Sequence, residues 1–336
     1  MRVFVVVFAV VVYLFLVDGV VTAGTASGAG WKEMPVVPKL SGSTAARLAR
    51  DVASSRAAGN RRQVFMKVGD SNTEMAGVLY GLGCRQPKVG SRIGRAGLQA
   101  TIRRYNQIEL SDDLSFEGCD RITSFSRRSN AVRSGSWSTW SLELSGAFVG
   151  SSWEVSSQCR PKETPLACEV RMIKPVFALV MTGTNDIPFD LAFGIDPGTQ
   201  TRERISALVK SIRDLGSVPV LSTLPPAIRS GTSENRILRI NALITAVARK
   251  KRVPLVNLWR GLTGQQMINQ GLSEDGLHLS TFPNEESVIF PVPGIFDGSV
   301  NFSTEALRYG ANRRNLIYLR TLAALDRIVD GRRSKR

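Results

Sequence analysis

The sequence predicts an α/β fold in which helices cover both faces of a mostly parallel central sheet. Short, fully apolar runs are typical of strands buried on both faces of a parallel sheet, and here they alternate with segments that have the spacing of amphipathic helices. Of the 336 residues, 43% are hydrophobic and 21% are charged, as in globular proteins with a sizeable core. This composition excludes an intrinsically disordered chain, a collagen and a multi-span membrane protein.

The expected strands and helices follow one another along the chain. An apolar run at 64–68 predicts the first strand, and a fully apolar run at 176–181 predicts the next. Because strands and helices then alternate, βαβ units and a parallel sheet are expected. The elements after the second strand are a helix over 202–215, a strand at 218–221, a helix over 237–248, a strand at 253–258 and a closing helix over 311–329.

The chain begins with the pattern of a cleaved signal peptide, expected at 1–23. Arg2 precedes an apolar run at 3–17, and Val21-Thr22-Ala23 has the small-x-Ala pattern of a cleavage site. The run is shorter than the roughly 20 residues of a spanning helix, which leaves an uncleaved anchor as the alternative. We therefore expect a secreted or extracytoplasmic protein with no transmembrane span after cleavage.

The rest of the chain divides into three parts by composition. Residues 24–62, rich in Gly, Ala, Ser and Arg, are expected to form a linker or a loosely ordered arm. Residues 63–330 are expected to form one domain, with a Cys-containing insertion from about 83 to 168. Residues 331–336 are a basic tail.

The four cysteines are an even set, which in an exported protein predicts disulfides. We expect Cys84 to pair with Cys119 and Cys159 with Cys168, because each pair lies within one stretch between motifs; two other pairings are possible. A zinc site is disfavoured because the cysteines form no CxxC pair and have no nearby histidine. Asn301 begins a glycosylation sequon, which has meaning only in a eukaryotic protein.

The chain is strongly basic, with 44 Lys and Arg against 28 Asp and Glu and a formal net charge of +16. Such a charge favours an anionic surface or polymer as partner, although it could serve solubility alone. Nucleic acid is not expected, because the basic residues are scattered and form no known binding motif. Trp137, Trp140 and Trp153 could line a sugar-stacking groove, but core packing is the alternative.

Three short polar motifs contain the residues that could do chemistry. They lie at 69–72, 183–186 and 275–278, and all three are expected at strand ends, where parallel sheets place their ligand sites. Each alone is a common turn sequence. Together they supply a hydroxyl, an amide, a carboxylate and His278, the only histidine in the chain. A hydroxyl nucleophile needs a base, and the base needs a partner that fixes its tautomer.

These motifs resemble those of the SGNH, or GDSL-like, hydrolases. Residues 64–71 resemble the family's first block, although Asn72 stands where leucine is usual. Residues 183–186 resemble the Gly-x-Asn-Asp block, and residues 275–278 resemble the Asp-x-x-His block. The resemblance spans about 63–330. It implies a three-layer α/β/α flavodoxin-like fold and serine esterase chemistry that needs no metal or cofactor.

The resemblance also implies a role for each motif residue. Ser71 would be the nucleophile, His278 the general base and Asp275 the group that orients the imidazole. The side chain of Asn185 and the backbone N–H of Ser71 would donate to the oxyanion.

The resemblance further implies a glycine whose backbone N–H supplies one more oxyanion donor. We choose Gly135, because it follows a plausible strand at 121–126. Gly94 and Gly97 are the alternatives, but both precede that strand. A plain turn glycine would also fit position 135.

The sequence thus predicts a secreted serine hydrolase that removes acyl groups from a carbohydrate or lipid, such as an acylated polysaccharide. Two alternatives stay open. An acyltransferase could use the same serine, and a non-catalytic polysaccharide-binding protein could have the same fold. A fluorophosphonate probe separates the binding protein from the other two, because only an activated serine reacts with it.

Overall fold

The computed structural model describes residues 29–90, 94–110, 118–144, 157–227, 234–264, 266–283 and 292–331. The predicted signal peptide at 1–23, Trp153 and all but the first residue of the basic tail lie outside these residues. Among the described residues, no helix has both the length and the hydropathy needed to cross a bilayer.

A four-stranded parallel sheet forms the centre of the molecule, in the order β1-β3-β4-β5. Every residue of β3 and β4 is buried, as expected for strands covered on both faces. The prediction of a mostly parallel α/β sheet is therefore confirmed. The strands span Arg61–Gly69 (β1), Pro175–Met181 (β3), Val218–Ser222 (β4) and Leu255–Val256 (β5).

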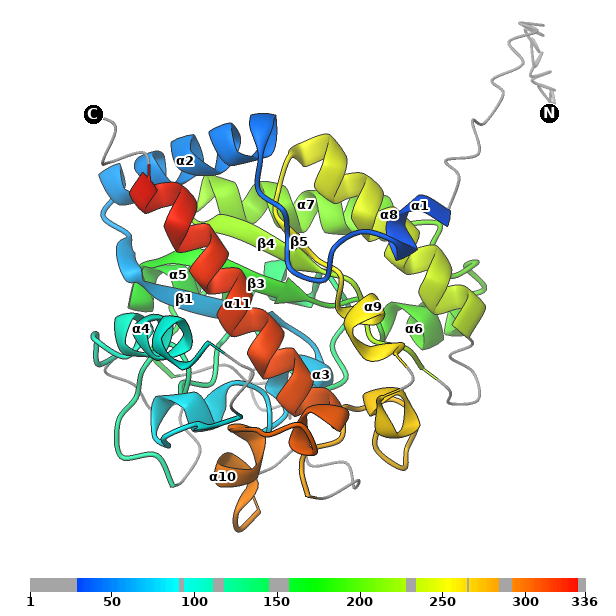
Figure 1. Ribbon diagram of the computed structural model, residues 1–336. Coiled ribbons are helices and arrows are strands. Elements are labelled where there is room, and N and C mark those ends of the chain that lie inside the picture. Colours follow the sequence, from blue (N-terminus) through cyan, green and yellow to red (C-terminus); the bar gives the residue numbers. More distant parts are fainter. Residues whose placement is uncertain are drawn as a thin grey trace, which may run out of the picture.

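Helices cover both faces of this sheet. Three helices, α5 (Pro165–Ile173), α7 (Thr201–Asp214) and α8 (Glu234–Lys251), each precede the next strand of the sheet. Because the strands step across the sheet in one direction, right-handed crossovers place these helices on one face. In Figure 1, α11 (Gly310–Gly331) and α4 (Arg95–Tyr105) cross in front of the sheet, with α7 behind it.

Short elements complete the chain. Strands β2 (Lys88–Val89) and β6 (Asn301–Phe302) form a separate parallel pair. The short helices are α3 (Ser71–Glu74), α6 (Asp186–Ala192), α9 (Leu258–Leu262) and α10 (Ile295–Ser299), and the 3-10 turns are η1 (Tyr80–Gly83), η2 (Trp140–Leu142), η4 (Ile268–Gly271) and η5 (Ala306–Arg308).

The amino-terminal segment differs from the linker or loose arm expected at 24–62. Its described part contains α1 (Ala29–Lys32) and a four-turn helix, α2 (Gly42–Ala57), that packs on α11 and over β3 and β4. Leu48 and Val52 of α2 are buried at helical spacing, although small and basic residues dominate the composition. Trp31 is also buried; its ring packs edge-on against Trp259, with centroids 5.2 Å apart, and its carbonyl accepts from the Asn257 amide.

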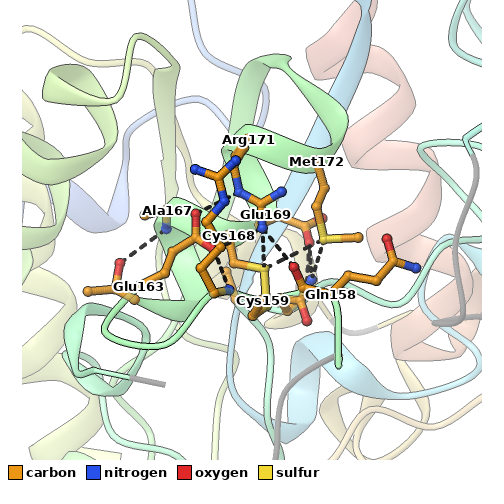
Figure 2. The surroundings of a disulfide bond; sticks show 12 residues. Gln158, Cys159, Glu163, Ala167, Cys168, Glu169, Arg171 and Met172 are labelled. Carbon is orange, nitrogen blue, oxygen red and sulfur yellow. Dashed lines mark hydrogen bonds and ion pairs between the residues drawn. A yellow bond between two sulfur atoms is a disulfide. The ribbon is translucent and has the colours of Figure 1, made fainter. Parts of the chain in front are cut away.

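The insertion contains both expected disulfides. The structure joins Cys84 to Cys119 and Cys159 to Cys168. In Figure 2, the second disulfide lies beside the ion pair of Glu163 with Arg171. The sulfurs of this disulfide and the Glu163 carboxylate are close enough to surround a metal ion, but bonded sulfurs are not thiolate ligands.

The strand expected at 121–126 does not form. Side chains there take the place of ladder bonds: the Ser124 hydroxyl accepts from Phe65 N–H of β1 (3.0 Å), and Ser126 Oγ donates to Arg121 O (2.7 Å). Serine side chains compete in this way with regular backbone pairing. Only further along does the segment pair with β1, through a single parallel bridge between Val132 and Gly69. The strand expected at 253–258 is likewise shortened to β5, because α9 begins at Leu258.

Candidate active site

Ser71 begins α3 directly after the carboxyl end of β1. An added Cβ at Gly69 would lie 2.1 Å from Met181 O, so only glycine lets β1 and β3 approach at this point. The Asp70 carboxylate caps α3 by accepting from Asn72 N–H (3.2 Å). This tight turn holds Ser71 at the sheet's carboxyl edge, with 7% of the residue exposed.

Ser71, His278 and Asp275 form a continuous chain of hydrogen bonds. Nε2 of His278 lies 2.8 Å from Ser71 Oγ, and Nδ1 lies 2.5 Å from Asp275 Oδ2. These residues are 207 positions apart in the sequence at their widest, and folding of the sheet brings them together. A hydroxyl, an imidazole and a carboxylate in this order can transfer the hydroxyl proton to the imidazole.

The Asp275 carboxylate is held by its own turn. Its Oδ1 accepts from the backbone N–H of Leu277 (3.0 Å) and of His278 (2.9 Å), and from the Ser273 hydroxyl (2.8 Å). Partial burial acts to raise the pKa of Asp275, but these bonds and the one from the imidazole outweigh it and hold the pKa well below its usual range. The carboxylate is therefore ionised and fixes the imidazole before any substrate binds.

Two buried side chains join the Ser71 turn to distant elements. Asn72, at the position where the resembled family has leucine, donates from Nδ2 to Leu277 O (3.1 Å) and so ties this turn to the histidine's turn. Arg314 of α11, only 1% exposed, donates to Asn72 O and to Thr73 Oγ1 (3.3 Å). Arg314 was not predicted from the sequence, because no pattern in the neighbouring residues distinguishes a buried arginine in a helix from an exposed one.

Asp70 lies completely buried beneath Ser71. Burial raises its pKa to about 6, although the charge of Arg314 and the backbone N–H groups of Thr184 and Asn72 oppose the shift. Asp70 thus caps α3, as its position in a turn motif suggests. Its negative charge is unfavourable in this buried environment.

Gly135 lies in a turn attached to the end of β1. Ser136 N–H closes the turn onto Arg133 O (3.2 Å), and Arg133 N–H donates to Gly69 O (3.1 Å). Gly135 has a φ of +78°, which a glycine adopts at little cost at the third position of a type II turn. Of the alternative glycines, Gly94 caps α4 and Gly97 lies inside it.

Asn185 stands on the other side of this turn, just before α6. Its Nδ2 donates to Ser136 O (3.0 Å), which leaves the second N–H of the same amide for another acceptor. The adjacent Asp186 accepts from the backbone N–H (2.8 Å) and the hydroxyl (2.6 Å) of Ser138. Burial raises the pKa of Asp186, and the Ser138 bonds oppose this shift. The turn and α6 are thus joined at two points.

The tryptophans divide between the core and the surroundings of this turn. Trp140 is 1% exposed and belongs to the core. Trp137 is half-buried and stacks on Phe189 of α6, with ring centroids 5.0 Å apart. Its indole N–H donates to Glu143 (2.7 Å), so Trp137 packs the turn against α6.

Comparison with known proteins identifies the family. Residues 120–281 match the model of the GDSL-like lipase/acylhydrolase family, and this segment contains Gly135, Asn185, Asp275 and His278. Ser71 precedes the matched segment and reaches it through the fold. No curated protein matches the chain in sequence.

Among solved structures, the chain is similar to three ester-cleaving or acyl-cleaving proteins, in each case at low identity. A lipase/acylhydrolase from Enterococcus faecalis is 17% identical, with a TM-score of 0.39, over 66% of this chain and 88% of that one. A peptidoglycan O-acetylesterase is 10% identical, with a TM-score of 0.48, over 88% of this chain and 100% of that one. A psychrotrophic esterase from Pseudoalteromonas is 15% identical, with a TM-score of 0.34, over 66% and 88%. By this match, residues 120–281 carry the features of a GDSL-like lipase/acylhydrolase domain, and the chain is an ester-cleaving enzyme.

Proposed function

We propose that the chain hydrolyses carboxylic esters through an acyl-enzyme formed on Ser71. The observation that carries this proposal is the chain of hydrogen bonds from Ser71 Oγ through the His278 imidazole to the Asp275 carboxylate. The backbone N–H groups of Ser71 and Gly135 and the Asn185 amide are the proposed oxyanion donors. The attachment of the Gly135 turn to the end of β1 and to Asn185 supports this assignment.

The mechanism then follows from these groups. Ser71 Oγ attacks the ester carbonyl carbon while Nε2 of His278 takes the hydroxyl proton. The carbonyl oxygen becomes an oxyanion and is held by the three donors. When the intermediate collapses, the bond to the leaving alcohol breaks, and His278 gives its proton to the alcohol oxygen. Water, deprotonated by His278, attacks the acyl-enzyme and releases a carboxylic acid and free Ser71.

We further propose that this enzyme is secreted and acts on acyl groups of a carbohydrate or lipid. The signal pattern at 1–23 and the two disulfides support an oxidising compartment outside the cytoplasm. The net charge of +16 supports an anionic polymer, such as an acidic acylated polysaccharide, as substrate or anchor.

The decisive experiment compares the Ser71→Ala variant with the wild type on a short aryl ester and with a fluorophosphonate probe. We expect the variant to lose hydrolysis and labelling and to keep its melting temperature, because alanine removes only the attacking oxygen. Ser211→Ala, on the outer helix α7, is the matched control and should match the wild type. Turnover that survives in Ser71→Ala would remove Ser71 from the mechanism.

A further inference from the structure

Glu74, in the same short helix as Ser71, carries a buried carboxylate that binds the turn containing Gly135. One of its oxygens, Oε2, accepts from the backbone N–H and from the hydroxyl of Ser134, both at 2.6 Å. Its other oxygen, Oε1, pairs with Arg128 at 2.9 Å. Only 6% of Glu74 is exposed. A carboxylate is stable in a buried position only where such partners compensate its lost hydration, so the two bonds to Ser134 specify where the turn lies relative to α3.

The bonds to Ser134 bear directly on the direction of the Gly135 N–H. That N–H belongs to the peptide between Ser134 and Gly135, at the centre of the turn that Ser136 closes onto Arg133. Turns of types I and II differ by a flip of this central peptide, which reverses the direction of its N–H. By holding both the N–H and the hydroxyl of Ser134, Glu74 fixes the residue on which this peptide pivots.

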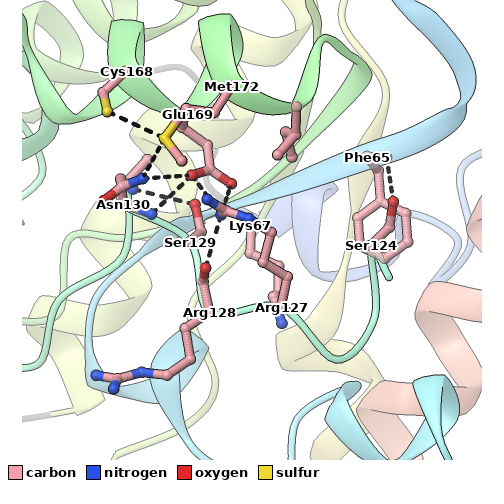
Figure 3. A network of polar contacts seen from close by, with 12 residues as sticks. Phe65, Lys67, Ser124, Arg127, Arg128, Ser129, Asn130, Cys168, Glu169 and Met172 are labelled. Carbon is pink, nitrogen blue, oxygen red and sulfur yellow. Dashed lines mark hydrogen bonds and ion pairs between the residues drawn. The ribbon is translucent and has the colours of Figure 1, made fainter. Parts of the chain in front are cut away.

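Arg128 lies at the opposite side of the Glu74 carboxylate, in the segment that leads to the turn. Figure 3 shows that the neighbouring arginines diverge: Arg127 points to Glu169, whereas the Arg128 side chain extends away from it. Glu169 also accepts from Asn130 N–H at 2.9 Å. The segment before the turn is thus fixed by one carboxylate from α5 and one from α3, and the second is only three residues from Ser71.

We propose that Glu74 is a positioning residue for ester cleavage, because its carboxylate keeps the Gly135 N–H directed at the oxyanion that forms on the carbon attacked by Ser71. Glu74 does not touch the substrate; it couples the nucleophile's helix to the donor's turn. This inference rests on the proposed function of Ser71. It adds to the three oxyanion donors a residue that orients one of them.

The test is the Glu74→Gln variant, which keeps the side chain's size and removes its charge. We expect kcat to fall about 10- to 100-fold, because a displaced oxyanion donor is worth up to ~10²–10³ in rate. KM should stay within about twofold, since ground-state binding does not use the oxyanion hole. The inhibition constant of a short alkyl boronic acid, whose adduct on Ser71 places an oxygen in the oxyanion hole, should rise by a similar factor.

Glu163→Gln is the matched control. Glu163 also accepts from an arginine, Arg171, and from a backbone N–H, that of Arg160, but it lies in the Cys159–Cys168 loop. Its loss should leave kcat and boronate inhibition unchanged. A Glu74→Gln enzyme with wild-type kcat and boronate affinity would overturn the proposal.

A second variant keeps the test valid if Glu74→Gln does not fold. Ser134→Ala removes one of the two bonds to Glu74 and keeps the backbone bond. It should lower kcat and boronate affinity together by roughly 3- to 10-fold, and an unchanged kcat in the folded variant would contradict the proposal. If Ser71→Ala is inactive and both variants match the wild type, this inference alone fails; if Ser71→Ala stays active, the proposed function fails first.

Discussion

At the scale of single residues, Asp70 shows how a buried helix cap beside Ser71 couples stability to pH. It is fully buried, and its pKa is raised to about 6, above the value of about 3.9 for a free aspartate. Between these two pH values the folded protein keeps a proton that the unfolded chain has lost. The contribution of Asp70 to stability is therefore greatest in acid and declines as the pH rises from about 4 to about 6.

We predict that Asp70→Asn removes this decline. The free energy of unfolding of the variant, relative to the wild type, should rise by up to about 3 kcal/mol between pH 4 and pH 7, since asparagine does not ionise. Urea unfolding at a series of pH values measures this difference. Asp120→Asn, at an exposed position, should follow the wild-type curve. A difference between Asp70→Asn and the wild type that does not change with pH would contradict the assignment.

At the scale of elements, the turn of Arg133 to Ser136 and the helix α4 place opposite demands on their glycines: the turn requires a glycine, and the helix does not. Gly135 has a φ of +78°, so a side chain there would strain the turn or flip its central peptide. Gly97 lies inside α4, and an added Cβ would meet no atom within 4 Å.

We predict that Gly135→Ala lowers kcat by at least about 10-fold, because the strained turn no longer presents its N–H to the oxyanion. Gly97→Ala should leave kcat unchanged and raise the melting temperature slightly, since alanine favours a helix interior. Steady-state kinetics on an aryl ester and thermal unfolding of both variants provide the measurement. Equal kcat for Gly135→Ala and Gly97→Ala would mean that the turn supplies no oxyanion donor.

At the scale of the whole molecule, the net charge of +16 should make the protein bind to anionic matrices. Deleting residues 331–336 removes four basic side chains, those of Arg332, Arg333, Lys335 and Arg336. We predict that the shortened protein elutes from a sulfonate resin at lower salt, because fewer counterions are exchanged on binding. Ester hydrolysis in solution should not change. An unaltered elution salt would show that the tail takes no part in docking.

The same scale shows what the sequence can and cannot predict. Strands β3 and β4 were predictable because their runs are fully apolar and end in turn residues. The helix α2 was not, because alanine, serine and arginine conceal the buried spacing of Leu48 and Val52. At 121–126, a strand was a plausible expectation, but the hydroxyls of Ser124 and Ser126 bind the backbone instead.

For the candidate site, motif spacing placed Ser71, Asp275 and His278 at one edge of the sheet, where they lie together. The contacts that support these residues could not be predicted from the sequence. Glu74 meets Ser134 across 60 positions, and Arg314 meets Asn72 across 242 positions. Pairs of that kind leave no local pattern in a single sequence.

The contact of Arg314 with the Ser71 turn has a consequence for the timing of activity during biosynthesis. Arg314 belongs to α11, the last helix in the described part of the chain, while the turn that it supports follows β1. A nascent chain still emerging from the ribosome has the Ser71 hydroxyl but not yet the Arg314 guanidinium or the His278 imidazole. Under the proposed mechanism, we therefore expect ester cleavage to begin only after His278 and α11 have been synthesised and have packed against the Ser71 turn.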